Sequence, residues 1–341
     1  MGTFQMLHFS SGHLPLALIC LSNSPTSVGN PINRKAGSRV WFAAQCPGGL
    51  RAGTPDEVDP RAFDLIVLGM QESQYGAPGV RELMGRIARS RKPCFAIMNM
   101  PPLPYLERIP GLDTEALAGC YADPAVWEGF DPAHITLASP DPQAFRPAGE
   151  PKNVLQVGLP TNFKVARFAS DADTAMLREL AEGIERARFA VDGEALEIPV
   201  KLKVHDSVFV PLAKWPMLIA GNYRCIRPDD MIPIKEAVHG DVAISREIYD
   251  WVAKLCHRLG AESEDLVPFE KYAKAAEGLG KPSSAARALF GGAHHIERVD
   301  SLVRRIAHQL ELHSEPLHEI VALIDERLGR NRTAAAQAAA A

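Results

Sequence analysis

The sequence predicts an α/β protein: a Rossmann-like parallel-sheet N-terminal domain followed by an all-α C-terminal domain. Short apolar runs alternate with an amphipathic helical stretch in the first part, as parallel sheets with crossover helices require. Beyond about residue 206 the periodicity becomes almost wholly helical. The 341 residues suffice for two domains of ordinary size. We expect domains over 1–206 and 207–330, and a frayed Ala-rich tail over 331–341 that lacks a core face.

Composition excludes several classes of function. The formal net charge of -4 leaves no basic face for nucleic acid. No apolar run approaches the ~20 residues that cross a bilayer. Residues Met1 to His13 contain no Lys or Arg, which is unlike a secretion signal. The expectation is a cytoplasmic protein that binds neither nucleic acid nor membrane.

The cysteines indicate no covalent framework. The six are widely spaced and form no CxxC pair, so neither a zinc site nor disulfides are implied. We expect them to serve as small buried hydrophobic residues.

The first part is assigned in chain order. A strand over Thr3 to Phe9, a turn and a helix over Leu14 to Leu21 come first. The continuous apolar runs are typical of strands buried on both faces. The remaining strands are expected at Arg39 to Ala44, Phe63 to Leu68, Cys94 to Met98, Ile135 to Leu137 and Val154 to Val157, and helices at Gly79 to Ser90 and Ala172 to Ala187.

The second part is assigned to helices alone. Apolar residues recur there at helical spacing between Pro- and Gly-containing breaks. The expected helices are Leu212 to Cys225, Ile244 to Leu259, Pro268 to Leu279, Ile296 to Leu310 and Leu317 to Leu328.

The first strand, turn and helix would be the place for a dinucleotide pyrophosphate. The usual fingerprint there is GxGxxG, and this chain keeps only Gly12, in Ser10-Ser11-Gly12-His13-Leu14-Pro15. A glycine at that point lets backbone approach phosphate. One glycine is weak support for nucleotide binding.

The second domain opens with a polar pair on a helix. Lys214 and Asn222 are eight residues apart, with Leu218 midway, so all three are expected on one helix face. In a cleft they would donate protons or hydrogen bonds to a carbonyl substrate. From spacing alone, a solvated lysine and a surface asparagine remain the alternative.

A third cluster spans Lys281 to Asp300. Ser283 and Ser284 precede a helix-like stretch, where one of them serves as an N-cap, and Glu297 opens the next helix. The adjacent His294 and His295 point in different directions on a helix, so no metal site is expected. Nothing in the chain matches a GxSxG elbow or a Walker A loop, so hydrolase and kinase chemistry have no support.

Together these segments resemble the ketopantoate reductases, which reduce a 2-oxo acid to a 2-hydroxy acid. AIMNMPP, PLAKWPMLIAGN and SSAARALFGGAHHIERVD carry the likeness, which is best from Phe209 to Leu328. The residues matching the family's site are Asn99 near the nicotinamide, the catalytic Lys214, Asn222, the substrate-carboxylate Ser284, and Glu297, whose spacing differs by about one residue from the family's.

The resemblance implies a cofactor, NADPH or NADH, and chemistry in a cleft. Lys214 would act as general acid on the developing alkoxide, and Glu297 would orient Lys214 or the substrate. Asn222 and Ser284 would bind a small 2-oxo acid or imine, while Gly12 and Asn99 would face the cofactor. A homodimer is also implied by the family.

The sequence departs from the family at its cofactor half. Gln45 stands where the family has a basic residue for the 2′-phosphate, Gln71 lies near the place of a family lysine, and Leu218 replaces an asparagine. Two hypotheses remain: a reductase with a changed substrate, and a non-catalytic or differently catalytic ligand-binding descendant of the same fold.

Overall fold

The computed structural model describes residues 3–11, 14–22, 39–40, 54–141, 144–145, 155–157, 161–191, 194–197 and 200–340. They form two compact units. The sheet unit comprises Met1–Met70, Gln74–Tyr105 and Ala125–Asp206, and the helical unit comprises Gln71–Ser73, Leu106–Pro124 and Ser207–Ala341. Gly12 and Gln45, two residues of the expected cofactor half, lie outside the described residues.

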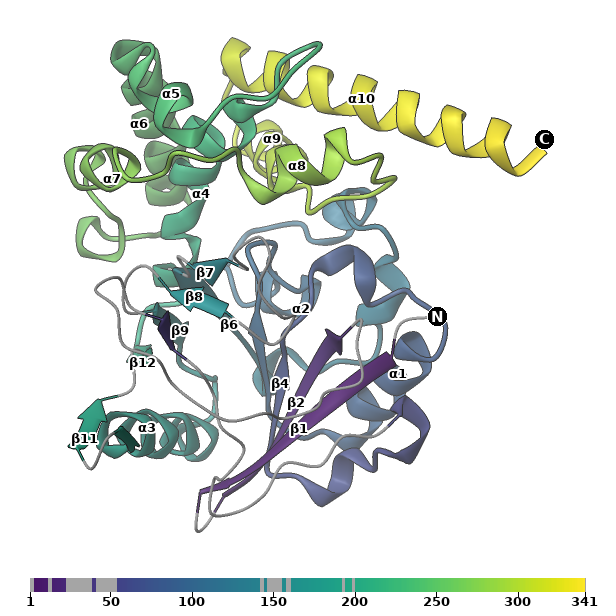
Figure 1. Ribbon diagram of the computed structural model, residues 1–341, viewed down its shortest axis with the longest axis vertical. Helices are drawn as coiled ribbons and strands as arrows, with labels where there is room; N and C mark the ends of the chain where they lie inside the picture. The colour runs from purple at the N-terminus through teal and green to yellow at the C-terminus, as the bar shows by residue number, and fades with distance from the viewer. Residues whose placement is uncertain are drawn as a thin grey trace. The chain divides into compact units, whose positions relative to one another are not determined.

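A mixed, mostly parallel sheet of seven strands organises the sheet unit (Figure 1). Its spatial order follows the chain, and β2, β4, β5 and β6 are all parallel. β9 then runs antiparallel to β6 and parallel to β12. The strands are β1 (Thr3–Ser11), β2 (Leu14–Ser22), β4 (Leu65–Leu68), β5 (Cys94–Ile97), β6 (Ile135–Asp141), β9 (Thr161–Ala166) and β12 (Val200–His205).

The beginning of the chain differs from the prediction. Residues Leu14–Ser22 form strand β2, which pairs antiparallel with β1, so the expected helix over Leu14 to Leu21 is wrong. The pairing of the two strands runs from Thr3 with Ser22 to Ser11 with Leu14. Two features of the sequence explain the difference. Pro15 has no backbone N–H to donate, and the apolar run around Ile19 suits a strand as well as a helix.

The helices α1 (Val80–Ser90) and α3 (Asp171–Arg186) lie on opposite sides of the sheet (Figure 1). Each connects two neighbouring parallel strands, and crossovers of this kind are right-handed. Because the β9–β12 pair runs opposite to the β4–β5 pair, the same handedness places α3 on the other face. Alternate residues of β4 therefore face different helices.

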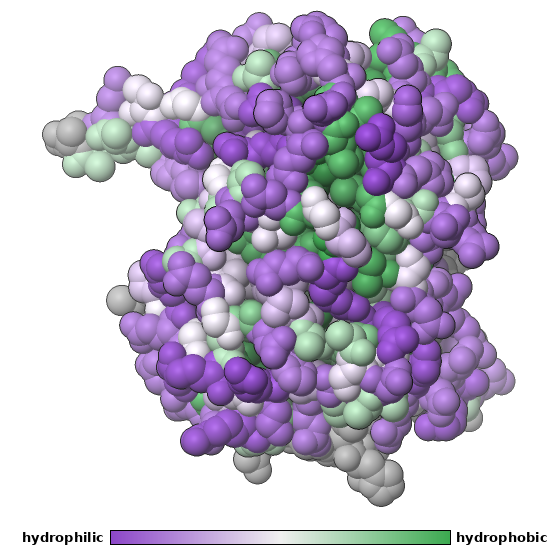
Figure 2. Space-filling model, turned by 180° about the vertical axis from the view of Figure 1, so that it is seen from behind, coloured by the Kyte–Doolittle hydropathy of each residue, from purple (hydrophilic) through white to green (hydrophobic). Residues whose placement is uncertain are grey.

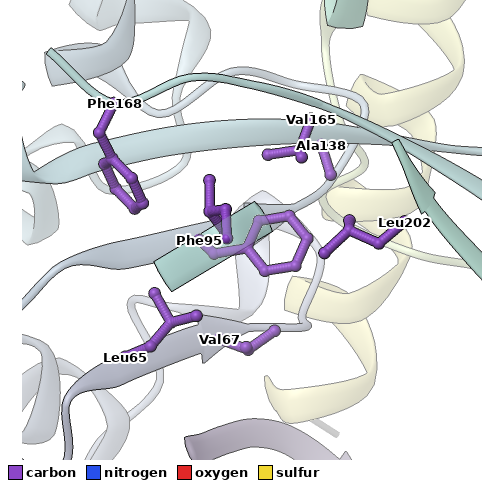
Figure 3. Packing of buried hydrophobic residues seen from close by; sticks show 8 residues of the cluster. Leu65, Val67, Phe95, Ala138, Val165, Phe168 and Leu202 are labelled. Carbon is purple, nitrogen blue, oxygen red and sulfur yellow. The ribbon is translucent and has the colours of Figure 1, made fainter. Parts of the chain in front are cut away.

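One core cluster fills the face beneath α3 (Figure 3). Leu65 and Val67 of β4 and Phe95 of β5 pack there beside Leu177 of α3, all nearly fully buried. Burying each large apolar side chain contributes about 1.5–3 kcal/mol. The other members are Ala138, Val165, Phe168 and Leu202.

Smaller elements surround the main sheet. β3 (Arg39–Val40) and β8 (Leu155–Val157), expected as strands, belong instead to a separate sheet with β7 (Ala144–Phe145). β10 (Arg188–Val191) and β11 (Glu194–Glu197) form a two-stranded sheet. Between β5 and β6 the chain forms α2 (Leu103–Leu106) and short 3₁₀ helices at Glu115–Cys120, Pro124–Trp127 and Pro132–His134.

The helical unit contains helices in the five places predicted beyond residue 206, together with α8 and with α5, for which no helix was predicted. They are α4 (Lys214–Met217), α5 (Ile234–His239), α6 (Val242–Leu259), α7 (Phe269–Ala276), α8 (Ser284–Phe290), α9 (Val299–Gln309) and α10 (Glu315–Ala340). The expected frayed tail instead continues α10 to Ala340, since alanine has the highest helix propensity. Its last turns project from a mostly hydrophilic surface (Figure 2).

Two further expectations are addressed by the described residues. Cys94, Cys120, Cys225 and Cys256 are free and buried, as predicted for small hydrophobic residues. Among the described helices, none is long and apolar enough to cross a membrane.

Candidate active site in the helical unit

The segment that carries Lys214 and Asn222 changes helix type along its length. A 3₁₀ turn, Val210–Ala213, leads into α4, and α4 leads into a π-helical turn, Leu218–Asn222. A π turn holds more residues per turn than an α-helix, so spacing of four no longer keeps one face. The expected single face through Lys214, Leu218 and Asn222 is therefore interrupted. Short π turns inside helices occur frequently at functional sites.

Side chains from neighbouring elements satisfy the backbone carbonyls around the π turn. The Tyr272 hydroxyl donates to the Met217 carbonyl oxygen at 3.0 Å. The Ser283 hydroxyl donates to the Asn222 carbonyl oxygen at 2.7 Å, and the Cys225 thiol to that of Gly221 at 3.5 Å. A buried carbonyl without a partner would cost about 1–3 kcal/mol, so these donors stabilise the unusual helix.

Gly221 is the residue that permits the closest approach. A β-carbon at Gly221 would lie 1.9 Å from the Tyr272 hydroxyl oxygen and 3.1 Å from Val238 Cγ2. Only glycine leaves room for the tyrosine that bonds the π turn. The sequence signal was present, as the glycine of LIAGN precedes Asn222 directly, but its structural reason was not predicted.

Ser283, rather than Ser284, is the serine joined to this segment. Its hydroxyl caps α8 by accepting from the Ala286 amide at 3.1 Å while donating to Asn222. Ser283 is 2% exposed, whereas Ser284 begins α8 with its side chain exposed. Ser283 is therefore the expected N-cap, and Ser284 takes no part in these hydrogen bonds to the π-helical segment.

The backbone of Glu297 is also hydrogen-bonded to the segment that follows the π turn. The Tyr223 hydroxyl donates to the Glu297 carbonyl oxygen at 2.6 Å and accepts from the Val299 amide at 3.1 Å. Burial raises the pKa of Tyr223 well above its usual value, so the hydroxyl stays protonated and can donate. Tyr223 follows the π turn directly and thus ties Glu297 to the segment that carries Asn222.

Glu72 is a functional candidate that sequence reasoning missed. It is 2% exposed, and its Oε1 accepts from the Ala122 amide at 2.9 Å. The pKa of Glu72 is raised to about 7, chiefly by burial and in part by the nearby Glu297, while hydrogen bonds from backbone amides oppose the shift. Strongly perturbed carboxyl groups concentrate at functional sites. The available signal in the sequence was that Glu72 directly follows Gln71, which lies near the place of a lysine in the resembled family.

The remaining predicted residues are distributed between the units. Lys214 is half-buried at the first position of α4 in the helical unit. Asn99 follows β5 by two residues in the sheet unit. The hydrogen bonds above join Asn222 to Ser283 and Glu297 to Tyr223; Gly12 lies outside the described residues.

His294 and His295, set aside as metal ligands, lie in the loop before α9. Both are mainly exposed; partial desolvation and the nearby positive charge of Arg332 lower the pKa of His295.

No family model and no curated protein matches the sequence. Solved structures do match. D-mandelate dehydrogenase with NADH and anilino(oxo)acetate aligns with a TM-score of 0.53 at 11% identity, over 79% of this chain and 78% of its own. A ketopantoate reductase of the PanE/ApbA family from Ralstonia eutropha JMP134 gives 0.51 at 15% identity, over 80% of each chain.

A third structure is a dimeric ketopantoate reductase from Staphylococcus aureus. It gives a TM-score of 0.55 at 11% identity, over 86% of this chain and 87% of that one. Matches at such low identity establish architecture and leave activity to the site. The chain therefore shares the fold of the ketopantoate reductases and of D-mandelate dehydrogenase, a Rossmann-like sheet followed by a helical region.

Proposed function

We propose that this protein is an NAD(P)H-dependent oxidoreductase that reduces the carbonyl of a small 2-oxo acid, or the matching imine. The observation that carries the proposal is Lys214, a lysine at the start of a helix that becomes π-helical at Leu218–Asn222. This helix lies in a fold shared with two kinds of 2-oxo acid reductase. The protein is further proposed to be cytoplasmic and, as in one neighbour, a dimer.

The roles of the chain's own residues follow from their chemistry. Lys214 is the general acid, because an ammonium beside a developing alkoxide both stabilises its charge and supplies its proton. Asn222 and Ser284 bind the substrate's polar groups, and Glu297 orients Lys214 or the substrate. Reduction itself needs a hydride, which a nicotinamide cofactor supplies when it is bound.

The described residues do not form the usual cradle for that cofactor at Gly12. β1 and β2 are an antiparallel hairpin, so no helix N-terminus follows β1 to receive a pyrophosphate. Among the described strands, the main sheet follows chain order throughout and has no point where that order reverses. Such points are where open α/β sheets bind nucleotides. The proposal therefore depends on the helical unit, with Asn99 as the cofactor contact in the sheet unit.

The β1–β2 hairpin favours a second candidate function. A descendant of this fold would bind a small oxo acid through the helical unit without transferring hydride. Such a protein would need Asn222 and its neighbours but not Lys214 as a proton donor.

Turnover by matched lysine variants tests the proposed role. We expect oxidation of NADPH or NADH when a panel of 2-oxo acids is added. Lys214→Ala should lower kcat by about 10²–10⁴-fold, the range that general acid catalysis contributes. Lys254→Ala, an exposed lysine of α6, should leave kcat unchanged. Turnover retained in Lys214→Ala would remove this lysine from the mechanism.

A further inference from the structure

Three ligating side chains meet where α10 begins. His313, Glu315 and His318 each offer one ligand atom, and these atoms lie within 4.8 Å of one another. The His313 Nε2 and Glu315 Oε2 atoms are 3.4 Å apart. In the described part of the chain this is the one group of three or more His, Cys, Asp or Glu that is so arranged.

Local backbone structure explains why the two histidines meet. Ser314 precedes α10, its hydroxyl accepts from the Leu317 amide at 3.4 Å, and its carbonyl oxygen accepts from the His318 amide at 3.1 Å. With Ser314 as N-cap, His313 and His318 occupy the two positions that usually form a hydrophobic staple. Here imidazoles replace the apolar pair, with ring centroids 4.8 Å apart in an edge-to-face arrangement.

The spacing suits a small divalent ion. Ligand atoms about 2.1 Å from a tetrahedral ion lie about 3.4 Å from each other. The His313–Glu315 pair has that separation already, and the exposed side chains can close the remaining gap by rotating. Two imidazoles and one carboxylate are a set that zinc, cobalt and nickel accept. The Glu315 carboxylate also offsets the positive end of the α10 dipole.

A cavity of about 410 Å³ adjoins the group. His313 and His318 line it together with Trp251, Arg304 and His308. Three protein ligands leave coordination positions open on the ion, and His313 and His318 place those positions next to this cavity.

We propose that His313, Glu315 and His318 bind one divalent transition-metal ion, with water in the open positions. The proposal is independent of the reductase function, because none of the three residues belongs to the candidate active site. It also adds a site where the sequence alone predicted no metal.

Calorimetric titration of the tag-free full chain with Zn²⁺, and separately with Co²⁺, tests the proposal. We expect one equivalent to bind in the micromolar range. His318→Gln and Glu315→Gln should each weaken binding at least tenfold, because each removes one of three ligands. His294→Gln, an exposed histidine outside the group, should bind as the parent protein does. Circular dichroism of each variant shows that it is folded.

Two results would overturn the proposal. The first is a parent protein that binds neither ion below millimolar concentration. The second is unchanged stoichiometry and affinity in a folded His318→Gln variant, which would place any bound ion elsewhere on the surface.

Discussion

At the scale of single residues, Glu72 couples folding to pH. Its pKa is about 7 in the folded protein against 4.5 for an ordinary glutamate, mainly because it is buried. A raised carboxyl pKa means that the folded state holds a proton that the unfolded chain has released. Stability is therefore unaffected below pH 4.5 and falls as the pH rises from there through 7. The loss amounts to about 3 kcal/mol.

Chemical unfolding between pH 4 and 8 measures this effect. Glu72→Gln stays neutral and keeps an oxygen for the Ala122 amide, so it should be more stable than the parent at pH 8 and similar at pH 4. Glu247→Gln, at an exposed position on α6, is the control and should follow the parent. Equal pH dependence in the parent and in Glu72→Gln would contradict the assignment.

Gly221 gives a second residue-scale prediction. Gly221→Ala should destabilise the protein by about 2–3 kcal/mol, because the new methyl group would overlap the Tyr272 hydroxyl. Tyr272→Phe in the same chain should recover part of that loss, which a double-mutant cycle measures. Gly183→Ala is the control: nothing lies within 4 Å of its β-carbon in α3, so the change should be neutral or stabilising. A harmless Gly221→Ala would show that the π turn is packed otherwise.

At the scale of elements, two adjacent serines at the start of α8 have different structural roles. Ser283→Ala should cost about 1–2 kcal/mol of unfolding free energy, since it removes a helix cap and the donor to the Asn222 carbonyl. Ser284→Ala, at an exposed position, should cost little. Thermal and chemical unfolding of the two variants gives the comparison. A larger loss for Ser284→Ala would contradict the hydrogen-bonding pattern described here.

Helices and strands could be predicted where the hydrophobic pattern of the sequence fitted only one of the two. The run Phe63 to Leu68 is too short and too apolar for a surface helix, and β4 lies within it. Ala172 to Ala187 has an amphipathic period over four turns, and α3 matches it closely. The prediction of a helix over Leu14 to Leu21 was wrong because a run of eight apolar residues fits a strand and a helix equally well.

The change of helix type after Lys214 could not be predicted from local sequence. It depends on hydroxyl donors from Tyr272 and Ser283, which are distant in the chain. Glu72 was missed for the same reason: its burial and its neighbour Glu297 arise only from tertiary structure. Lys214 and Glu297 remain predictions that rest on the order of motifs, which can be read from the sequence without knowledge of the packing.

At the scale of the whole molecule, the two-part architecture was within reach of the sequence, since helical periodicity takes over near residue 206. The helical unit comprises Ser207–Ala341 and, in addition, Gln71–Ser73 and Leu106–Pro124. These additions bring Glu72 to the helical unit, where its amide partner Ala122 also lies. Contacts between segments so far apart in sequence leave no periodic signal.

The proposed function requires that this fold still binds a nicotinamide cofactor despite its hairpin start. Titration of the full chain with NADH and with NADPH, followed by nicotinamide fluorescence, tests it most directly. We expect saturable binding of at least one cofactor below millimolar concentration, and we expect Lys214→Ala to retain it because that lysine acts on the substrate. Binding of neither cofactor below millimolar concentration would contradict the reductase and leave the ligand-binding descendant.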